Sequence, residues 1–191
     1  MSSIAGLVLA GGKSSRMGQD KALLEYQGQP LLKFQMQKLE TVGCQPIAIS
    51  GPSGRGYEKF TKLVIKDLIP DLGPMGGIYS ALKKIEAEKI LVLGVDLPNV
   101  TTDFLSRLIE KSEGHDATFP VSRHGAEPLC AIYQAKLCLS VIEERIQLDD
   151  LSLQRFINAM GERGRNLEIE PAEWTWFGDD LLKNWNELND L

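Results

Sequence analysis

A glycine-rich segment that carries three basic side chains is the part of this sequence best suited to bind phosphate. It reads LAGGKSSRMGQDK from position 9 to position 21 and directly follows an apolar run. Glycine lets backbone N–H groups come close to an anion, and Lys13, Arg16 and Lys21 can neutralise a polyphosphate. The spacing matches neither the P-loop pattern nor GxGxxG, so neither a P-loop NTPase nor a common dinucleotide site is indicated. The alternative interpretation is a tight surface turn with scattered basic residues.

An aspartate at the end of a buried strand is the best candidate for a metal ligand. Asp96 directly follows the apolar run at 90–95, where a carboxylate is costly to bury unless its charge is compensated. Mg²⁺ is usually held by one or two carboxylates together with substrate phosphates, so one aspartate is sufficient. The alternative role is an N-cap for the following helix, a role that Thr102 is expected to take. We therefore expect Asp96 to hold Mg²⁺.

Two further points along the chain carry residues suited to a ligand. Asp67 follows the apolar stretch at 63–65 as Asp96 follows its own strand, with a turn residue as the alternative. Asp71 precedes Gly73-Pro74 and is interpreted as a turn residue. Gly76-Gly77 is expected to open a helix, because unpaired N–H groups at a helix start favour an anion or a close backbone approach.

The C-terminal end carries two asparagines, Asn184 and Asn186, at alternate positions. On an extended segment alternate side chains share a face, so both amides could hydrogen-bond one phosphate. Capping or turn formation is the alternative. The nearby Trp174, Trp176 and Trp185 are interpreted as packing residues of this segment.

The elements that must position these residues alternate between strands and helices. Short apolar runs indicate buried strands, and apolar residues at spacings of three and four indicate helices. This alternation predicts an α/β protein with a mostly parallel sheet covered on both faces, in which ligands bind at the carboxyl ends of the strands. The expected strands are 4–10, 47–49, 63–65, 90–95, 117–120 and 129–133, and the expected helices are 30–42, 76–87, 102–109, 135–145 and 152–160.

Length, charge and composition limit the class of protein. The chain has 191 residues and a formal net charge of −5, without repeats or a long linker, which predicts a single domain over residues 1–191. A negative charge does not favour binding to nucleic acid. The first apolar run is too short for a signal peptide or a membrane span. Three cysteines without CxxC spacing fit neither a disulfide framework nor a zinc site, so we expect a cytoplasmic protein.

Several segments together resemble the MobA family, the molybdenum cofactor guanylyltransferases. The segment at 9–21 is similar to the family signature LAGGxSxRMGxDK. Four further segments continue the likeness over nearly the whole chain: GPMGGI at 73–78, which resembles GPLGGI; DLP at 96–98, which resembles DMP or DTP; EPL at 127–129 with Tyr133; and NWNELNDL at 184–191, which resembles NxNTPEDL with a replaced centre.

The resemblance implies a three-layer Rossmann-like nucleotidyltransferase fold and a Mg²⁺-dependent enzyme. It would transfer GMP from GTP to molybdopterin or molybdenum-molybdopterin and release pyrophosphate. Nucleotidyl transfer depends mostly on positioning and charge stabilisation, so Arg16, Lys21 and Asp96 are the expected catalytic residues. The residues expected to bind the nucleotide are Leu9, Ala10, Gly11, Gly12, Lys21, Asp67 and Asp96.

The same resemblance implies an acceptor site and partner proteins. The acceptor would be contacted by Gly76, Gly77, Glu127, Asn184 and Asn186, although Glu127 could equally be a solvated carboxylate at the end of a hairpin. A molybdenum insertase and molybdoenzyme chaperones are the implied partners.

Three alternative functions stay open. A cytidylyltransferase or a sugar-phosphate nucleotidyltransferase would share this fold, but the family likeness of LAGG and GPMGG favours guanylyl transfer. The third alternative is a non-catalytic nucleotide-binding domain, which the altered C-terminal motif would fit and the intact Arg16, Lys21 and Asp96 oppose.

Overall fold

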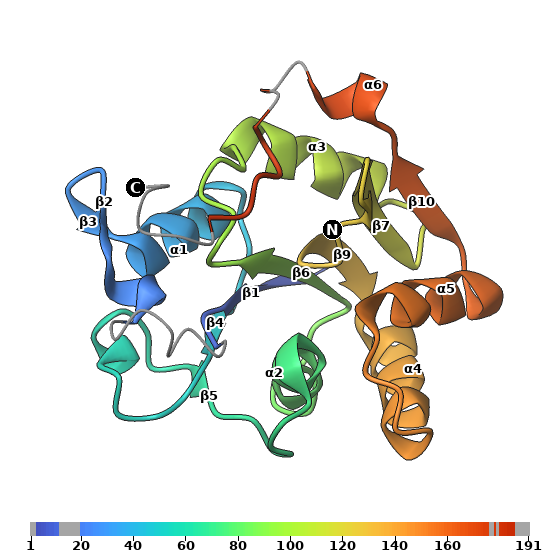
Figure 1. The fold of residues 1–191 in the computed structure, drawn as a ribbon, viewed down its shortest axis with the longest axis horizontal. Coiled ribbons are helices and arrows are strands. Elements are labelled where there is room, and N and C mark those ends of the chain that lie inside the picture. The colour runs from blue at the N-terminus through green and yellow to red at the C-terminus, as the bar shows by residue number, and fades with distance from the viewer. Residues whose placement is uncertain (1–2, 12–19, 176–177, 179, 186–191) are drawn as a thin grey trace.

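A mostly parallel β-sheet forms the middle layer of the molecule (Figure 1). The computed structural model describes residues 3–11, 20–175, 178 and 180–185. The strand order is β10-β7-β9-β6-β1-β4-β5, with β8 paired to β7. The strands are β1 (Ile4–Leu9), β4 (Ile47–Ser50), β5 (Val64–Ile65), β6 (Lys89–Gly94), β7 (Ala117–Ser122), β8 (Gly125–Ala126), β9 (Cys130–Gln134) and β10 (Asn166–Ile169).

Strand directions explain where a ligand can bind. β1 runs parallel to both β4 and β6, and β4 runs parallel to β5, so these four strands end at one edge of the sheet. β9 is antiparallel to β6 and β7, and β10 is parallel to β7. Because β4 lies on one side of β1 and β6 on the other, the chain reverses its direction across the sheet at β1, where open α/β sheets bind ligands.

Helices cover both faces of the sheet, as the alternating pattern predicts. Leu7 and Leu9 of β1 pack with the core that contains α2 (Gly73–Leu82), α4 (Ala135–Gln147) and α5 (Leu153–Arg163). Val8, which points the opposite way, packs with the core that contains α1 (Leu31–Thr41), α3 (Thr102–Lys111) and α6 (Pro171–Trp174). Figure 1 shows α1 and α3 on one side of β1 and β6 and α2 on the other. The three-layer fold is therefore confirmed.

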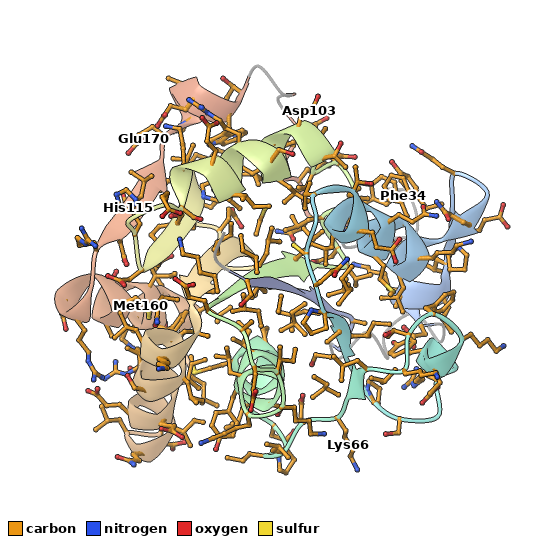
Figure 2. The ribbon with its side chains drawn as sticks, turned by 180° about the vertical axis from the view of Figure 1, so that it is seen from behind. Phe34, Lys66, Asp103, His115, Met160 and Glu170 are labelled. Carbon is orange, nitrogen blue, oxygen red and sulfur yellow. The ribbon has the colours of Figure 1, made fainter. Side chains whose placement is uncertain are left out.

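The side chains fill both layers between the helices and the sheet (Figure 2). Phe34 lies on α1, and Met160 lies on α5 in the second core, where it is fully buried. Both central strands, IAGLVL and KILVLG, are buried along almost their whole length, which explains why they read as continuous apolar runs. No helix in the described ranges is long and apolar enough to cross a membrane.

Several predicted boundaries differ from the structure. α1 begins at Leu31 with Pro30 as its N-cap, and α3 is capped by Thr101, whose Oγ1 accepts the Phe104 N–H at 3.1 Å, so the predicted cap at Thr102 is wrong by one residue. α2 begins at Gly73, three residues before the predicted start, and ends at Leu82. Pro74 fits this first turn because its missing N–H has no partner there.

Four short features were not predicted from the sequence. They are the β2 (Glu25–Tyr26) and β3 (Gln29–Pro30) hairpin, β8, β10 and α6. Strands of two residues are too short to show an alternating pattern, and β10 lies at the edge of the sheet with only Ile169 buried. Elements without an apolar face leave no periodic signal.

Candidate active site

The start of the glycine-rich segment is fixed to the neighbouring strand β4. The N–H groups of Ala10 and Gly11 both donate to the Ser50 carbonyl, at 2.9 and 3.1 Å. The Gly11 N–H is therefore already bonded, and a Cβ at Gly11 would meet nothing nearer than the Gly51 Cα, at 3.6 Å. The glycine thus leaves open space at the carboxyl ends of β1 and β4. The predicted contacts Gly12 and Arg16, with the basic Lys13, lie outside the described residues.

A cavity of about 310 Å³ opens at the carboxyl ends of β1, β4 and β5. Asp67 lines it, as the strand pattern predicted, beside Lys66, which Figure 2 labels at the end of β5. Burial raises the pKa of Asp67, and a hydrogen bond with Ser50 opposes that shift. The other lining residues are Gly11, Gly51, Pro52, Pro70, Asp71 and Gly73, and the positive φ of Asp71 agrees with its predicted turn role.

The glycine pair Gly76-Gly77 has a different local role from the one predicted. Because α2 begins at Gly73, both N–H groups lie inside the helix, so the expectation that they open it is wrong. A Cβ at Gly77 would lie 2.4 Å from Ser50 Oγ and 2.9 Å from Leu9 Cδ2. The missing side chain therefore lets α2 pack closely on β1 and β4, while the proposed acceptor contact of this pair stays a prediction.

The two described catalytic candidates, Lys21 and Asp96, meet through the main chain of Trp185. The Lys21 ammonium donates to the Trp185 carbonyl, and the Trp185 N–H donates to the Asp96 carbonyl at 2.9 Å. The indole also packs edge-on against Tyr26, with ring centroids 4.9 Å apart. One residue of the C-terminal segment thus joins the end of the glycine-rich segment to the end of β6.

Asp96 is a desolvated carboxylate beside a cation. Burial raises its pKa, while the nearby charge of Lys21 lowers it. The carboxylate folds back over the strand, since a Cβ at Gly94 would lie 2.6 Å from Asp96 Oδ1. Gly94 is therefore required by this side-chain position, a role that its place in an apolar run did not reveal.

A second cavity, of about 900 Å³, contains the two described acceptor candidates with polar side chains, Glu127 and Asn184. Ser122 Oγ donates to Glu127 Oε1 at 2.9 Å. Burial raises the pKa of Glu127, Ser122 and His124 lower it, and the charge of Asp96 raises it further. The two carboxylates therefore lie close enough to interact. The other predicted asparagine, Asn186, is outside the described residues.

The carboxylates of Asp96 and Glu127 suit Mg²⁺ better than a metal ion that is held by protein side chains alone. Within the described ranges, no three His, Cys, Asp or Glu side chains are grouped to hold a metal ion. Mg²⁺ needs only one or two carboxylates when phosphates and water complete its shell. Asp96, with Glu127 near it, has the oxygen donor atoms for such a site, and a bound cation would offset the burial that raises the pKa of both carboxylates.

Asp20 is a structural residue of the site whose role the sequence analysis did not identify. Its carboxylate accepts the Ala22 N–H at 3.1 Å and the Tyr57 hydroxyl at 2.6 Å, and Arg55 lies 3.5 Å away. It therefore begins the 3₁₀ turn Lys21–Leu23 and fastens it to the segment between β4 and β5. Its place one residue before Lys21 in the glycine-rich motif was the available signal.

Comparisons with known proteins identify relatives of this chain. The family model for the MobA-like NTP transferase domain matches residues 6–164. A probable molybdenum cofactor guanylyltransferase of Flavobacterium johnsoniae is 33% identical over 192 residues, covering 100% of this chain and 97% of the relative.

Solved structures show the same fold. Molybdopterin-guanine dinucleotide biosynthesis protein A from Archaeoglobus fulgidus superposes with a TM-score of 0.72 at 24% identity, covering 97% of this chain and 94% of that one. The 2-C-methyl-D-erythritol 4-phosphate cytidylyltransferase from Thermus thermophilus gives 0.71 at 12% identity, covering 100% and 95%. The fold alone therefore does not select the base of the nucleotide.

Proposed function

The chain belongs to the family of MobA-like NTP transferase domains, and from that premise we propose that it is a molybdenum cofactor guanylyltransferase. It would transfer GMP from GTP to molybdopterin or molybdenum-molybdopterin and release pyrophosphate. The observation that carries this proposal is the junction of Lys21 and Asp96 through Trp185 at the carboxyl end of β6. The name of the Flavobacterium johnsoniae relative, which this chain covers to 97%, supports guanylyl transfer and the molybdenum cofactor as acceptor.

The two cavities support separate sites for the two substrates. The nucleotide would occupy the cavity at the ends of β1, β4 and β5, where Asp67 supplies a hydrogen-bond acceptor. The acceptor would enter the larger cavity beside Glu127 and Asn184. Lys21 and Asp96 would then act between the two substrates.

In this reaction a terminal phosphate oxygen of the acceptor attacks the α-phosphorus of GTP in line. A new P–O bond forms, the bond to the β-phosphate oxygen breaks, and pyrophosphate leaves with the electron pair. An ammonium has three donors, and Trp185 is the acceptor of Lys21 among the described residues, so two N–H groups would serve phosphate oxygens. Arg16, five residues earlier, would add a second positive charge.

Asp96 is the residue that would hold Mg²⁺, with the Glu127 carboxylate nearby. When bound, Mg²⁺ would neutralise phosphate charge. Asp96 suits this role because its carboxylate is desolvated and fixed against Gly94. A side-chain nucleophile is not required, since the acceptor phosphate itself attacks.

A molybdenum insertase and molybdoenzyme chaperones are part of the same proposal, as proteins that would deliver the pterin and receive the product. We also propose a cytoplasmic location, where the three buried cysteines, which are free, would stay reduced.

Thermal stabilisation by nucleotides tests the base and the metal first. A ligand that binds only the native state raises the melting temperature, so GTP, CTP, ATP and UTP are compared with and without Mg²⁺. A shift confined to GTP with Mg²⁺ is expected. A shift with CTP or UTP would favour a cytidylyl or sugar-phosphate transferase, and no shift with any nucleotide would favour a non-catalytic domain.

Substitution of Asp96 then tests the catalytic role. Asp96→Ala should abolish pyrophosphate release with GTP and molybdopterin, while circular dichroism remains that of the folded protein. Full turnover by this variant at saturating Mg²⁺ would contradict the metal-binding role.

A further inference from the structure

Helix α1 buries two polar side chains on a face that otherwise packs as apolar core. Leu32, Met36 and Leu39 are buried, but so are Gln35, with no exposed area, and Lys38, with 7%. Burying an amide or an ammonium costs several kcal/mol unless it forms hydrogen bonds. A leucine or methionine would fill either position without this cost, so the polar groups require an explanation.

Both side chains donate to main-chain carbonyls at 94–98, the end of β6 and the loop that carries Asp96. Gln35 Nε2 lies 2.9 Å from the Gly94 carbonyl oxygen and 2.9 Å from that of Leu97. Lys38 Nζ lies 2.6 Å from the Pro98 carbonyl oxygen. The accepting carbonyls therefore lie on both sides of Asp96 in the chain.

The hydrogen bonds of Gln35 are all made by its NH₂ group. Its Oε1 atom is buried without a hydrogen-bond partner among the described residues. The cost of burying the Gln35 amide is thus only partly offset, and the hydrogen bonds that offset it are those to the Gly94 and Leu97 carbonyls. A side chain kept solely for packing would not need this arrangement.

The position of the Asp96 carboxylate depends on the conformation of this loop. Asp96 Oδ1 lies so close to Gly94 that a Cβ there would be 2.6 Å away. The Asp96 carbonyl also accepts the Trp185 N–H. A small rotation of the peptide groups between Gly94 and Leu97 would therefore move the carboxylate relative to Lys21.

From these contacts we infer that Gln35 and Lys38 are positioning residues that fix the Asp96 carboxylate for the metal–nucleotide complex. This inference rests on the proposed function, because it assigns Asp96 to a metal. The donors act through the loop and touch no substrate. Residues that orient a metal ligand in this way typically change metal affinity 10- to 100-fold when they are removed.

The test measures Mn²⁺ binding to the protein–GTP complex by electron paramagnetic resonance. Gln35→Leu removes both donors while keeping the volume, and Lys38→Met removes the third. We expect each variant to weaken Mn²⁺ binding about 10-fold or more, the size found for such orienting groups. Metal-free GTP binding should stay within about 2-fold, because the α1 side chains do not line the nucleotide cavity.

Two further variants separate positioning from general stability. Lys38→Arg retains a donor and should recover part of the Mn²⁺ affinity lost in Lys38→Met. Gln37→Leu is the matched control: Gln37 lies on the exposed side of α1, its side chain accepts from Gln29 Nε2, and the variant should bind Mn²⁺ as the wild type does. Thermal melts show which variants are folded.

The outcomes distinguish this inference from the proposed function. Wild-type protein that binds no GTP–Mn²⁺ would contradict both. Wild-type binding that persists unchanged in folded Gln35→Leu or folded Lys38→Met would overturn only the positioning role. If Gln35→Leu does not fold, Lys38→Met and Lys38→Arg decide the result.

Discussion

At the scale of single residues, Lys21 is the described cation placed best to act on phosphate. Replacing it with methionine should lower kcat about 10²- to 10³-fold, the size expected when one preorganised charge is lost from a transition state. The melting temperature should change little, because Lys21 is partly exposed. Pyrophosphate release and thermal melts measure the two effects.

The matched control for Lys21→Met is Lys33→Met, which removes an exposed ammonium from α1. It should retain the wild-type rate. Equal turnover of Lys21→Met and Lys33→Met would mean that Lys21 serves only to bind the Trp185 carbonyl.

At the scale of elements, two glycines of the predicted ligand-binding motifs perform different tasks. Gly77→Ala forces a methyl group against Ser50 and Leu9 where α2 packs on the sheet, and should lower the free energy of unfolding by about 1 to 3 kcal/mol. Gly11→Ala has room, with its nearest neighbour at 3.6 Å, but narrows the smaller cavity. It should weaken GTP binding and leave stability nearly unchanged, as urea titrations and calorimetry can test. If Gly77→Ala weakened GTP binding without loss of stability, and Gly11→Ala lowered stability without loss of binding, the two roles would be assigned the wrong way round.

The helices and strands also show which parts of the fold and of the site could be predicted from the sequence. The strand at 90–95 was predictable because a strand buried on both faces reads as an unbroken apolar run. α2 was predicted to begin late because Gly73-Pro74 resembles a turn, although proline also fits a first helical turn. Within the site, Asp67 and Asp96 were found because they follow strands. Gln35 was not found, because a helical pattern does not show which carbonyls a buried amide meets.

At the scale of the whole molecule, the C-terminal segment contacts residues that lie far from it in the sequence. Trp185 contacts Lys21 and Tyr26, which lie five residues apart in the chain, and Asp96, which follows β6. Asn184, directly before it, lines the larger cavity. The same segment thus borders the proposed acceptor site and joins the groups proposed to act on the nucleotide. Two consecutive residues, Asn184 and Trp185, therefore connect the two proposed sites.

Stability of the whole molecule should depend on pH through the buried amine of Lys38. Burial lowers the pKa of Lys38 to about 7, against 10.5 for an ordinary lysine. Between pH 7 and pH 9 the unfolded chain therefore holds a proton at Lys38 that the folded protein has largely lost. Because the unfolded state binds more protons, the free energy of unfolding rises with pH, by up to about 1.4 kcal/mol per pH unit for one such group.

Comparison with Lys38→Met isolates this contribution. The stability of the wild type relative to the variant should increase by at least about 1 kcal/mol from pH 7 to pH 9, a cautious fraction of the limiting slope. Urea denaturation at both pH values measures it. Burial raises the pKa of the thiols of Cys44 and Cys130 to about 12, so their ionisation in the unfolded chain near pH 9 lowers the stability of both proteins, and the comparison with Lys38→Met corrects for it. A stability difference that stays constant or falls with pH would mean that Lys38 keeps its proton when folded, and that the carbonyl of Pro98 stabilises a buried ammonium.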